Sequence, residues 1–475
     1  MKRLFASLLL ITILFSSCRT KGDSAPIELP KENVELHVWN LFDDTDVLKG
    51  PIQAFESAHP NIKVVYKKFV DVEEYEKFLI NEMAQGEGPD IFAIKNTWVD
   101  KHLKKIAPLP VGQTQTPMNE QIFEDTFFSL ASDDLIRDHQ IYAIPLYVDT
   151  LGMFYNKSVF RDNVPNTDKP AKTWKEIMKQ SAQITKKNNS LERFSLSGIS
   201  AGRIDNIRRG MDILSLMMLQ NNIEFWNTAG DRLVYSRQRR IDPETKDSFF
   251  PFEESIKLFT SFANPRFKNY TWSESMTARD KELQELRPFL EGKVSMIFGY
   301  SYLYEELLKV REQLLSKGVS VIPISDIQTQ EVPQMNNFAE TGKRDALAQY
   351  FPLTVSRNSL DTAEAWELLL FLSNKENVKH YSEVTKKPSS RKDLVEEQML
   401  DPLYGTFARQ ASYAKSFPKT DILDESHYTK AFGNIVTESL KNKKEIGALV
   451  QISEESLACQ KAKEDNPGES EKDCF

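Results

Sequence analysis

Hydrophobic and polar positions alternate with two different periods along the first hundred residues. Strand spacing occurs at 34–38, 62–66 and 90–94, and helical spacing at 47–58 and 73–85. In the first strand, for example, Val34, Leu36 and Val38 are separated by polar residues. Because strands and helices follow one another in turn, this part of the chain predicts an α/β domain with a largely parallel sheet.

The same mixture continues through the rest of the chain. Helices are predicted at 203–225 and 253–263, and two more behind the capping boxes Thr173–Glu176 and Asp361–Glu364. Strands are predicted at 145–155, 292–298 and 318–323. The stretch 326–349 is polar and has no clear period, so we expect a surface loop or a short hairpin there.

The N-terminus has the pattern of a secretion signal. Met1-Lys2-Arg3 precede an apolar run from Leu4 to Phe15, which is too short to span a bilayer as a helix. Ser16-Ser17-Cys18 then make it resemble a bacterial lipoprotein signal, and an ordinary secretion signal is the alternative. We expect a signal peptide at 1–17, lipid on Cys18, and a flexible polar tether at 18–32.

Length and composition narrow the class of protein. A chain of 475 residues exceeds what one core usually fills, so more than one lobe is expected. The net charge of −8 argues against a nucleic-acid partner. The six His are scattered, and we expect no metal and no cofactor. Cys459 and Cys474 lie close together in the sequence, and we expect them to be able to pair at the start of a flexible tail, 461–475.

Seven short patches occur in an order that is typical of one known family. They are Leu36-His37-Val38-Trp39, 54–64, Gly88-Pro89-Asp90-Ile91-Phe92, 142–157, Thr173-Trp174-Lys175-Glu176, Gly292-Lys293-Val294-Ser295-Met296 and Pro388-Ser389-Ser390-Arg391. Together they resemble the extracellular solute-binding proteins of ABC importers, in the maltose-binding-like carbohydrate branch. The chain departs from the family at Gln349-Tyr350-Phe351, where members often carry Gly-Gly.

The resemblance implies a two-lobed, periplasmic-binding-protein-like α/β fold, with mixed sheets flanked by helices and a ligand cleft between the lobes. Lobe one is expected at 33–148 and 322–382, and lobe two at 149–321 and 383–460. The implied protein is a lipid-anchored, exported monomer on the periplasmic or outer cell face. It would capture a mono- or oligosaccharide and deliver it to ABC permease subunits by hinge closure.

A sugar site needs aromatic rings to stack on and fixed polar groups for the hydroxyls. The candidate residues are Trp39, Asp43, Asp44, Asn96, Trp98, Tyr147, Asp149, Trp226, Tyr300, Tyr302 and Arg391. Each has a structural alternative. These alternatives are core packing for the aromatic residues, a cap or turn for Asp43 and Asp44, a hinge hydrogen bond for Asp149, and an exposed turn for Arg391.

Other functions remain as alternatives. A polyamine could use Asp43, Asp44 and Asp149, an oligopeptide could occupy the same cleft, and an adhesion lipoprotein would need no cleft. A glycosidase needs two carboxylates at a defined separation. No catalytic motif is recognised around such a pair, and we recognise neither a Gly-x-Ser-x-Gly elbow nor a phosphate-binding loop, so we do not expect an enzyme.

Overall fold

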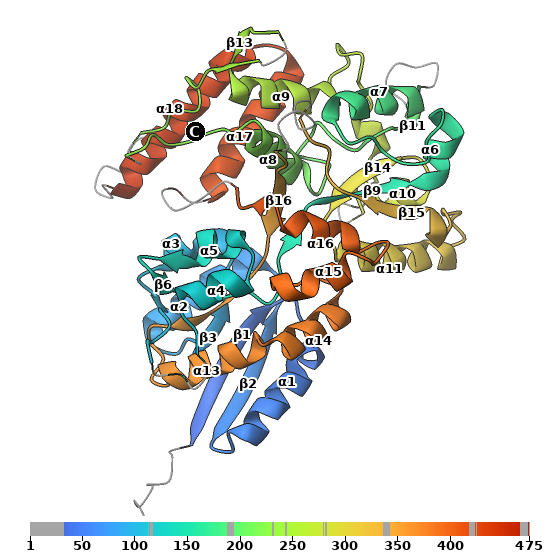
Figure 1. Ribbon diagram of the computed structural model, residues 1–475. Helices are drawn as coiled ribbons and strands as arrows, with labels where there is room; N and C mark the ends of the chain where they lie inside the picture. Colours follow the sequence, from blue (N-terminus) through green and yellow to red (C-terminus); the bar gives the residue numbers. More distant parts are fainter. Residues whose placement is uncertain are drawn as a thin grey trace, which may run out of the picture.

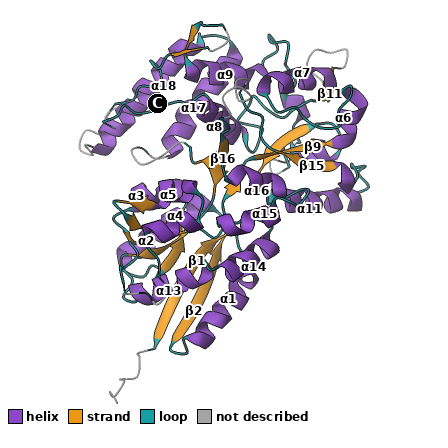
Figure 2. Ribbon diagram, viewed as in Figure 1, coloured by secondary structure: helices purple, strands orange, loops and turns teal. Residues whose placement is uncertain are grey.

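The computed structural model describes residues 33–112, 114, 117–187, 194–229, 232–242, 245–278, 280, 283–335, 343–417, 423, 425–465 and 474. These residues form two lobes, each with strands surrounded by helices (Figures 1 and 2). The expected signal peptide, Cys18 and the tether lie outside the described residues.

The first lobe is built on a mixed sheet. Its strands are β2 (Ile62–Phe69), β1 (Val34–Leu41), β3 (Ile91–Ala93), β17 (Leu353–Ser356) and β4 (Ile106–Ala107) in that order, with β7 (Ala143–Ile144) also paired to β17. The strands β1, β2 and β3 are parallel, and β17 is antiparallel to its neighbours. The parallel α/β arrangement expected for the first hundred residues is thus confirmed.

Helices cover this first sheet. They are α1 (Thr45–Ala58), α2 (Val72–Gln85), α13 (Thr362–Leu372) and α14 (Lys375–Thr385). α1 packs on β2 and contacts α13 and α14. α2 ends at Gly86, whose φ of +81° is a backbone conformation that favours glycine. The buried stripe of α2 is Tyr75, Leu79 and Met83, as its helical spacing predicts.

The second lobe contains a smaller antiparallel sheet in the order β14 (Met296–Gly299), β9 (Gly152–Asn156) and β15 (Ile327–Gln330). Its principal helices are α7 (Trp174–Ile184), α8 (Gly210–Gln220), α9 (Pro251–Ser261), α11 (Leu303–Ser316), α17 (Glu425–Lys441) and α18 (Ile446–Asp465). α8 is shorter than the helix predicted at 203–225, because the chain before Gly210 forms turns.

A small sheet joins the two lobes. It runs in the order β18 (Ala414–Lys415), β16 (Ala346–Gln349) and β8 (Asp149–Thr150), and β16 lies between the lobes in Figure 1. β8 leads from β7 of the first lobe into β9 of the second, and β16 leads towards β17. These crossovers allow the lobes to move as hinged bodies.

Three expectations about the segment 318–349 are wrong. The stretch 326–349 is not a loop or hairpin, since it carries β15 and β16, which pair with strands far away in the sequence. β15 also belongs to the sheet of the second lobe, although 322–382 was expected in lobe one. The segment 318–323 contains no strand. Its alternating apolar residues instead lead from α11 into the turn before β15.

The two capping boxes differ. Thr173 accepts a hydrogen bond from the backbone N–H of Glu176, at 3.3 Å, and its hydroxyl donates to the Glu176 carboxylate. The side chain of Asp361 makes no cap hydrogen bond to α13, and only its backbone carbonyl accepts one, from the Ala365 N–H, so the second capping box is corrected to a helix start without a side-chain cap.

The C-terminal part is helical for longer than expected. α18 continues through residues 461–465, which were assigned to a flexible tail, and Cys459 forms a disulfide with Cys474. α17 and α18 pack on each other and on α9. None of the helices in the described ranges is both long enough and apolar enough to cross a bilayer.

The remaining helices and strands connect these parts. They are α3 (Val99–His102), α4 (Glu120–Thr126), α5 (Ser129–Leu135), β5 (Ile136–Arg137), β6 (Gln140–Ile141), α6 (Lys157–Asn163), β10 (Lys186–Lys187), β11 (Phe194–Leu196), β12 (Arg240–Ile241), β13 (Ser248–Phe249), α10 (Leu286–Leu290), α15 (Val395–Gln398) and α16 (Gly405–Ala411).

Candidate functional site

A cavity of about 660 Å³ lies between the lobes. Its lining combines both lobes and the crossovers: Phe42, Asp43, Asp44, Val47, Val72, Tyr147, Asp149, Arg208, Arg209, Tyr300, Tyr302, Lys309, Gln349, Phe351, Thr385 and Lys387. The volume falls within the roughly 300–1,000 Å³ of small-molecule sites. The cavity lies beyond the carboxyl end of β1, which is the edge where open α/β sheets bind ligands.

Aromatic rings occupy opposite walls of the cavity. Tyr300 and Tyr302 stack in the second lobe with centroids 6.2 Å apart, and Phe42 meets Phe351 edge-on at 5.4 Å. Phe42 is 41% exposed and Tyr302 is 39% exposed, so both rings offer apolar surface. Phe42 also has a φ of +70°, a strained conformation for a non-glycine residue.

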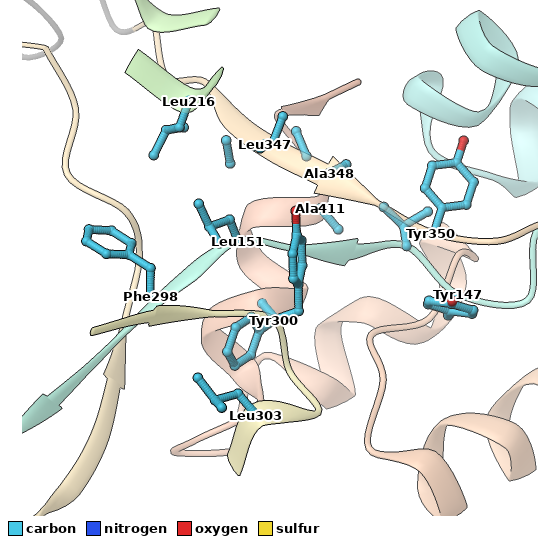
Figure 3. Close-up of a cluster of buried hydrophobic side chains, with 14 of the residues drawn as sticks. Tyr147, Leu151, Leu216, Phe298, Tyr300, Leu303, Leu347, Ala348, Tyr350 and Ala411 are labelled. Carbon is cyan, nitrogen blue, oxygen red and sulfur yellow. The ribbon is translucent and has the colours of Figure 1, made fainter. Parts of the chain in front are cut away.

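The aromatic wall is held by the core of the crossover. Figure 3 shows Leu151, between β8 and β9, together with Phe298 of β14 and Leu347 of β16, and Tyr300 near them. All three apolar side chains are buried. The backbone N–H of Leu151 also donates to the carbonyl of Leu347, at 2.8 Å. The position of Tyr300 is therefore tied to the segments that join the lobes.

Asp43 belongs to a buried network at the base of the cavity. Lys387 Nζ lies 2.6 Å from one carboxylate oxygen of Asp43, and the Tyr381 hydroxyl donates to the other at 2.6 Å. The Lys387 ammonium also lies 4.2 Å from the ring centroid of Tyr147, which stacks on Tyr381. The charge of Asp43 is therefore matched within the protein.

Asp149 connects the crossover to the second lobe. Its carboxylate accepts hydrogen bonds from the Ser301 backbone N–H, at 3.1 Å, and from the Ser301 hydroxyl, at 2.7 Å. Burial raises the pKa of Asp149 to about 6, against the lowering effect of the hydrogen bonds from Ser301. Asp149 thus lines the cavity and also makes the hinge hydrogen bond that was its structural alternative.

Two arginines of the second lobe reach the cavity without having been predicted. The Arg209 guanidinium lies 5.2 Å from the ring centroid of Tyr300, and it donates to the Tyr302 hydroxyl. Arg208 forms a two-point ion pair with Glu306 at 2.7 and 3.1 Å. Both arginines directly precede α8, and no feature of the sequence distinguishes them from other surface arginines.

The other missed lining residues come mostly from lobe one and the crossovers, and Lys309 comes from α11 of the second lobe. Lys387 and Thr385 come from the end of α14 and the loop behind it. Gln349 and Phe351 come from the segment where family members often carry Gly-Gly, and that departure was the one available signal. Phe42 gave none, since its positive φ appears only in the folded chain.

Three predicted aromatic residues lie outside the cavity, and we remove them from the site. Trp39 packs against Phe69 and Phe78, each with centroids 5.3 Å away, so the core-packing alternative applies. Trp98 is 6% exposed and meets the ring of His102 edge-on. Trp226 donates from Nε1 to a tyrosine hydroxyl of α17, at 2.9 Å.

Two predicted polar residues also lie outside the cavity. Asn96 is buried and donates to Asp134 and Ser416, which is a structural role. Arg391 forms an ion pair with Asp393 at 3.0 Å and donates to a backbone carbonyl of the first lobe. Of the predicted residues, the structure brings together Asp43, Asp44, Tyr147, Asp149, Tyr300 and Tyr302.

One catalytic sequence pattern is present, although none was recognised in the sequence. Gly198-Ile199-Ser200-Ala201-Gly202 has the Gly-x-Ser-x-Gly spacing of a nucleophile elbow. Such an elbow exposes its serine between a strand and a helix. Here Ser200 is fully buried, its hydroxyl has no hydrogen-bond partner among the described residues, and α8 begins only at Gly210. The pattern therefore does not form an elbow.

Two lobes, joined by crossover strands and enclosing an aromatic and polar cavity, define a hinged solute-binding protein. The comparison with protein families agrees. Residues 42–379 match the family described as bacterial extracellular solute-binding protein, and the chain belongs to this family. It is therefore an exported solute-binding protein, as its sequence predicted.

Curated relatives are distant. The chain is 23% identical over 157 residues to the maltotriose-binding protein of Pyrococcus abyssi, covering 32% of this chain and 31% of that protein. It is 24% identical over 186 residues to the galactooligosaccharide-binding protein of Bacillus subtilis, covering 37% and 39%. The chain thus spans less than two thirds of the length of either relative.

Solved structures match almost the whole chain. The sugar-binding protein MalE from Xanthomonas citri has a TM-score of 0.70 at 17% identity, covering 92% of this chain and 100% of that one. A solute-binding protein from Thermotoga lettingae, bound with alpha-D-tagatose, has a TM-score of 0.66 at 15% identity, covering 90% and 99%. At these identities the likeness concerns the fold, and it confirms the two-lobed architecture.

Proposed function

We propose that this protein captures a carbohydrate, a mono- or oligosaccharide, between its lobes and delivers it to the permease subunits of an ABC importer. The observation that carries the proposal is the pair of exposed aromatic rings on opposite walls, Phe42 and Tyr302. Aromatic faces stack on the apolar faces of sugar rings, while the surrounding polar groups bond the hydroxyls.

Of the seven charged side chains that line the cavity, five form ion pairs within the protein, which favours a neutral solute; the other two are Asp149 and Lys309. Asp43 is paired with Lys387, Asp44 with Lys68, Arg208 with Glu306 and Arg209 with Asp212. Asp149 is buried and accepts hydrogen bonds from Ser301. A polyamine would need carboxylates that are not already matched, because desolvating its ammonium groups is costly. Hydroxyl groups instead bond well to paired and fixed polar side chains.

Hinge closure follows from the position of the cavity. A solute that contacts Phe42 in the first lobe and Tyr302 in the second makes both sets of contacts only when the lobes are close. Binding therefore favours the closed arrangement, by as much as the affinities for the two arrangements differ. The closed shape is what permease subunits would recognise.

We further propose that the protein is not an enzyme and that it acts as a monomer. We propose that a lipid on Cys18 anchors the chain to the membrane. Measuring the mass of the chain isolated from membranes tests this, because the lipid adds to that mass. The domain ranges expected from the sequence remain the working division, with 322–330 moved to lobe two and 383–385, the end of α14, moved to lobe one. The similarity to relatives named for maltotriose and for galactooligosaccharide supports the carbohydrate assignment.

Thermal unfolding in the presence of a solute panel tests the proposal. Maltotriose, a galactooligosaccharide and simple sugars should each be compared with spermidine and with short peptides. A sugar at one hundred times its dissociation constant should add about 2.7 kcal/mol to the free energy of unfolding. If only spermidine or a peptide raises the melting temperature, the ligand class is wrong. If no solute does, the adhesion alternative is favoured.

A further inference from the structure

A second, smaller cavity adjoins the main cavity on the side of α17. Its polar lining comes from both lobes: Lys95, Thr97, Asp212, Ser215, Gln349 and Glu425. Tyr300 and Gln349 line both cavities. The two cavities therefore share part of their lining, and a displacement of Tyr300 or Gln349 alters the shape of both.

An ion pair crosses this smaller cavity from lobe to lobe. Lys95 Nζ lies 2.6 Å from each carboxylate oxygen of Glu425, although the two residues are 330 positions apart. Lys95 follows β3 of the first lobe, and Glu425 begins α17, which packs on α9 and α18 in the second. The Lys95 side chain is 13% exposed and that of Glu425 is 35% exposed, so water screens the pair somewhat less than it screens a fully exposed pair.

The ion pair depends on the spacing of the lobes. Charge-assisted hydrogen bonds of this kind have lengths of about 2.7–2.9 Å, and a hinge movement of a few ångströms would break both contacts. Neither Lys95 nor Glu425 lines the main cavity. Because a hinge movement would break the ion pair, this interaction stabilises the arrangement of the lobes seen here and does not stabilise a more open one.

Charged groups link this ion pair to the wall of the main cavity. Asp212 lines the smaller cavity and lies 3.4 Å from Arg209. Arg209 in turn donates to the hydroxyl of Tyr302, which faces the main cavity. A row of polar side chains thus runs from the contact between the lobes to the aromatic wall.

We propose that Lys95 and Glu425 are positioning residues whose ion pair holds the lobes at the spacing seen here and so sets how readily the main cavity closes. The inference goes beyond sugar capture, because it concerns the balance between lobe arrangements when no solute is bound. It rests on the two-lobed fold and on the ion pair itself. It holds whichever solute the protein carries.

Distances between spin labels on the two lobes test the proposal without a ligand. Leu360, 98% exposed before α13, and Ile241, 69% exposed in β12, are changed to Cys in a chain carrying Cys18→Ser. Lys95→Met and Glu425→Gln should each lower the ratio of close to separated lobes by about two- to fivefold. The double variant should resemble either single variant, because both remove the same interaction.

Lys101→Met is the matched control. It removes an ion pair of similar length, 2.7 Å to Glu76, that lies wholly within the first lobe. It should leave the distance distribution unchanged, and circular dichroism should show that every variant is folded. Unchanged distances in Lys95→Met and Glu425→Gln, additive effects in the double variant, or an equal shift in Lys101→Met would overturn the proposal. Because no solute is added, these results do not depend on the sugar assignment.

Discussion

Tyr302 stacks on Tyr300, is 39% exposed and lines the cavity, which Phe42 lines from the first lobe. At the scale of single residues, the site thus combines free aromatic surface with charges of which most are already paired. Asp43 shows the second property most clearly, since an ammonium and a phenol hydroxyl occupy its two carboxylate oxygens. Such a site suits a neutral solute with many hydroxyl groups.

Tyr302→Ala should weaken binding of the sugar found in the solute panel. Loss of one stacking face is expected to cost about 1–2 kcal/mol, which is roughly 5- to 30-fold in the dissociation constant. Isothermal titration calorimetry measures it. Phe267→Ala is the control, because Phe267 is similarly exposed, at 42%, but does not line the cavity. Equal affinities for Tyr302→Ala and the unchanged protein would remove this ring from the site.

Asp149 should make stability depend on pH. Its folded pKa of about 6 is above the value near 3.9 of an unfolded Asp, so the folded state holds the proton more tightly. The group therefore opposes folding increasingly as the pH rises from about 4 to about 6, by about 3 kcal/mol in total. Asp149→Asn removes this titration. Urea unfolding at several pH values should show the variant gaining stability relative to the unchanged protein over that range, and parallel curves would contradict the expectation.

At the scale of secondary structure, apolar periodicity and helix caps predicted an element well when the pattern lay within the element's own residues. β1, α1, β2, α2 and β3 follow the predicted order, because each needs only its own pattern of apolar residues. β15 and β16 were missed, because each has only four residues, too few to show a period, and because their partners, β9 and β8, lie far away in the sequence. Strand pairing of that kind is a tertiary property.

Thr173→Ala should lower the free energy of unfolding by about 1 kcal/mol, because it removes the hydrogen-bond acceptor at the start of α7. Chemical denaturation measures the change. Thr173→Ser retains the hydroxyl and should recover most of the loss. If serine destabilises the protein as much as alanine, packing of the threonine methyl group, rather than the cap, explains the effect.

At the scale of the whole molecule, the crossovers and the Lys95–Glu425 ion pair determine how the lobes relate to each other. β8 and β16 connect the lobes through a shared sheet, while the ion pair meets from opposite lobes at the smaller cavity. The crossover segments are continuous chain, and they permit hinge movement. The ion pair is a reversible contact, so the distances between the spin labels proposed above report directly on whether it is formed.

The sequence by itself determined the class of this protein. Alternating strands and helices and the ordered family patches depend on local patterns, which are visible in the sequence alone. It also identified Asp43, Tyr147, Asp149 and Tyr302, because they follow strands or stand in a crossover, where cavities form.

Only the tertiary structure decided which side chains share the cavity. Trp39 and Tyr302 both belong to strand–loop segments rich in aromatic residues, yet one packs beneath α2 and the other faces the cavity. Arg208, Arg209 and Lys387 enter the site from segments that carry no motif. The physical reason is that a side chain's direction and partners depend on how distant segments pack together, and no local period encodes that packing.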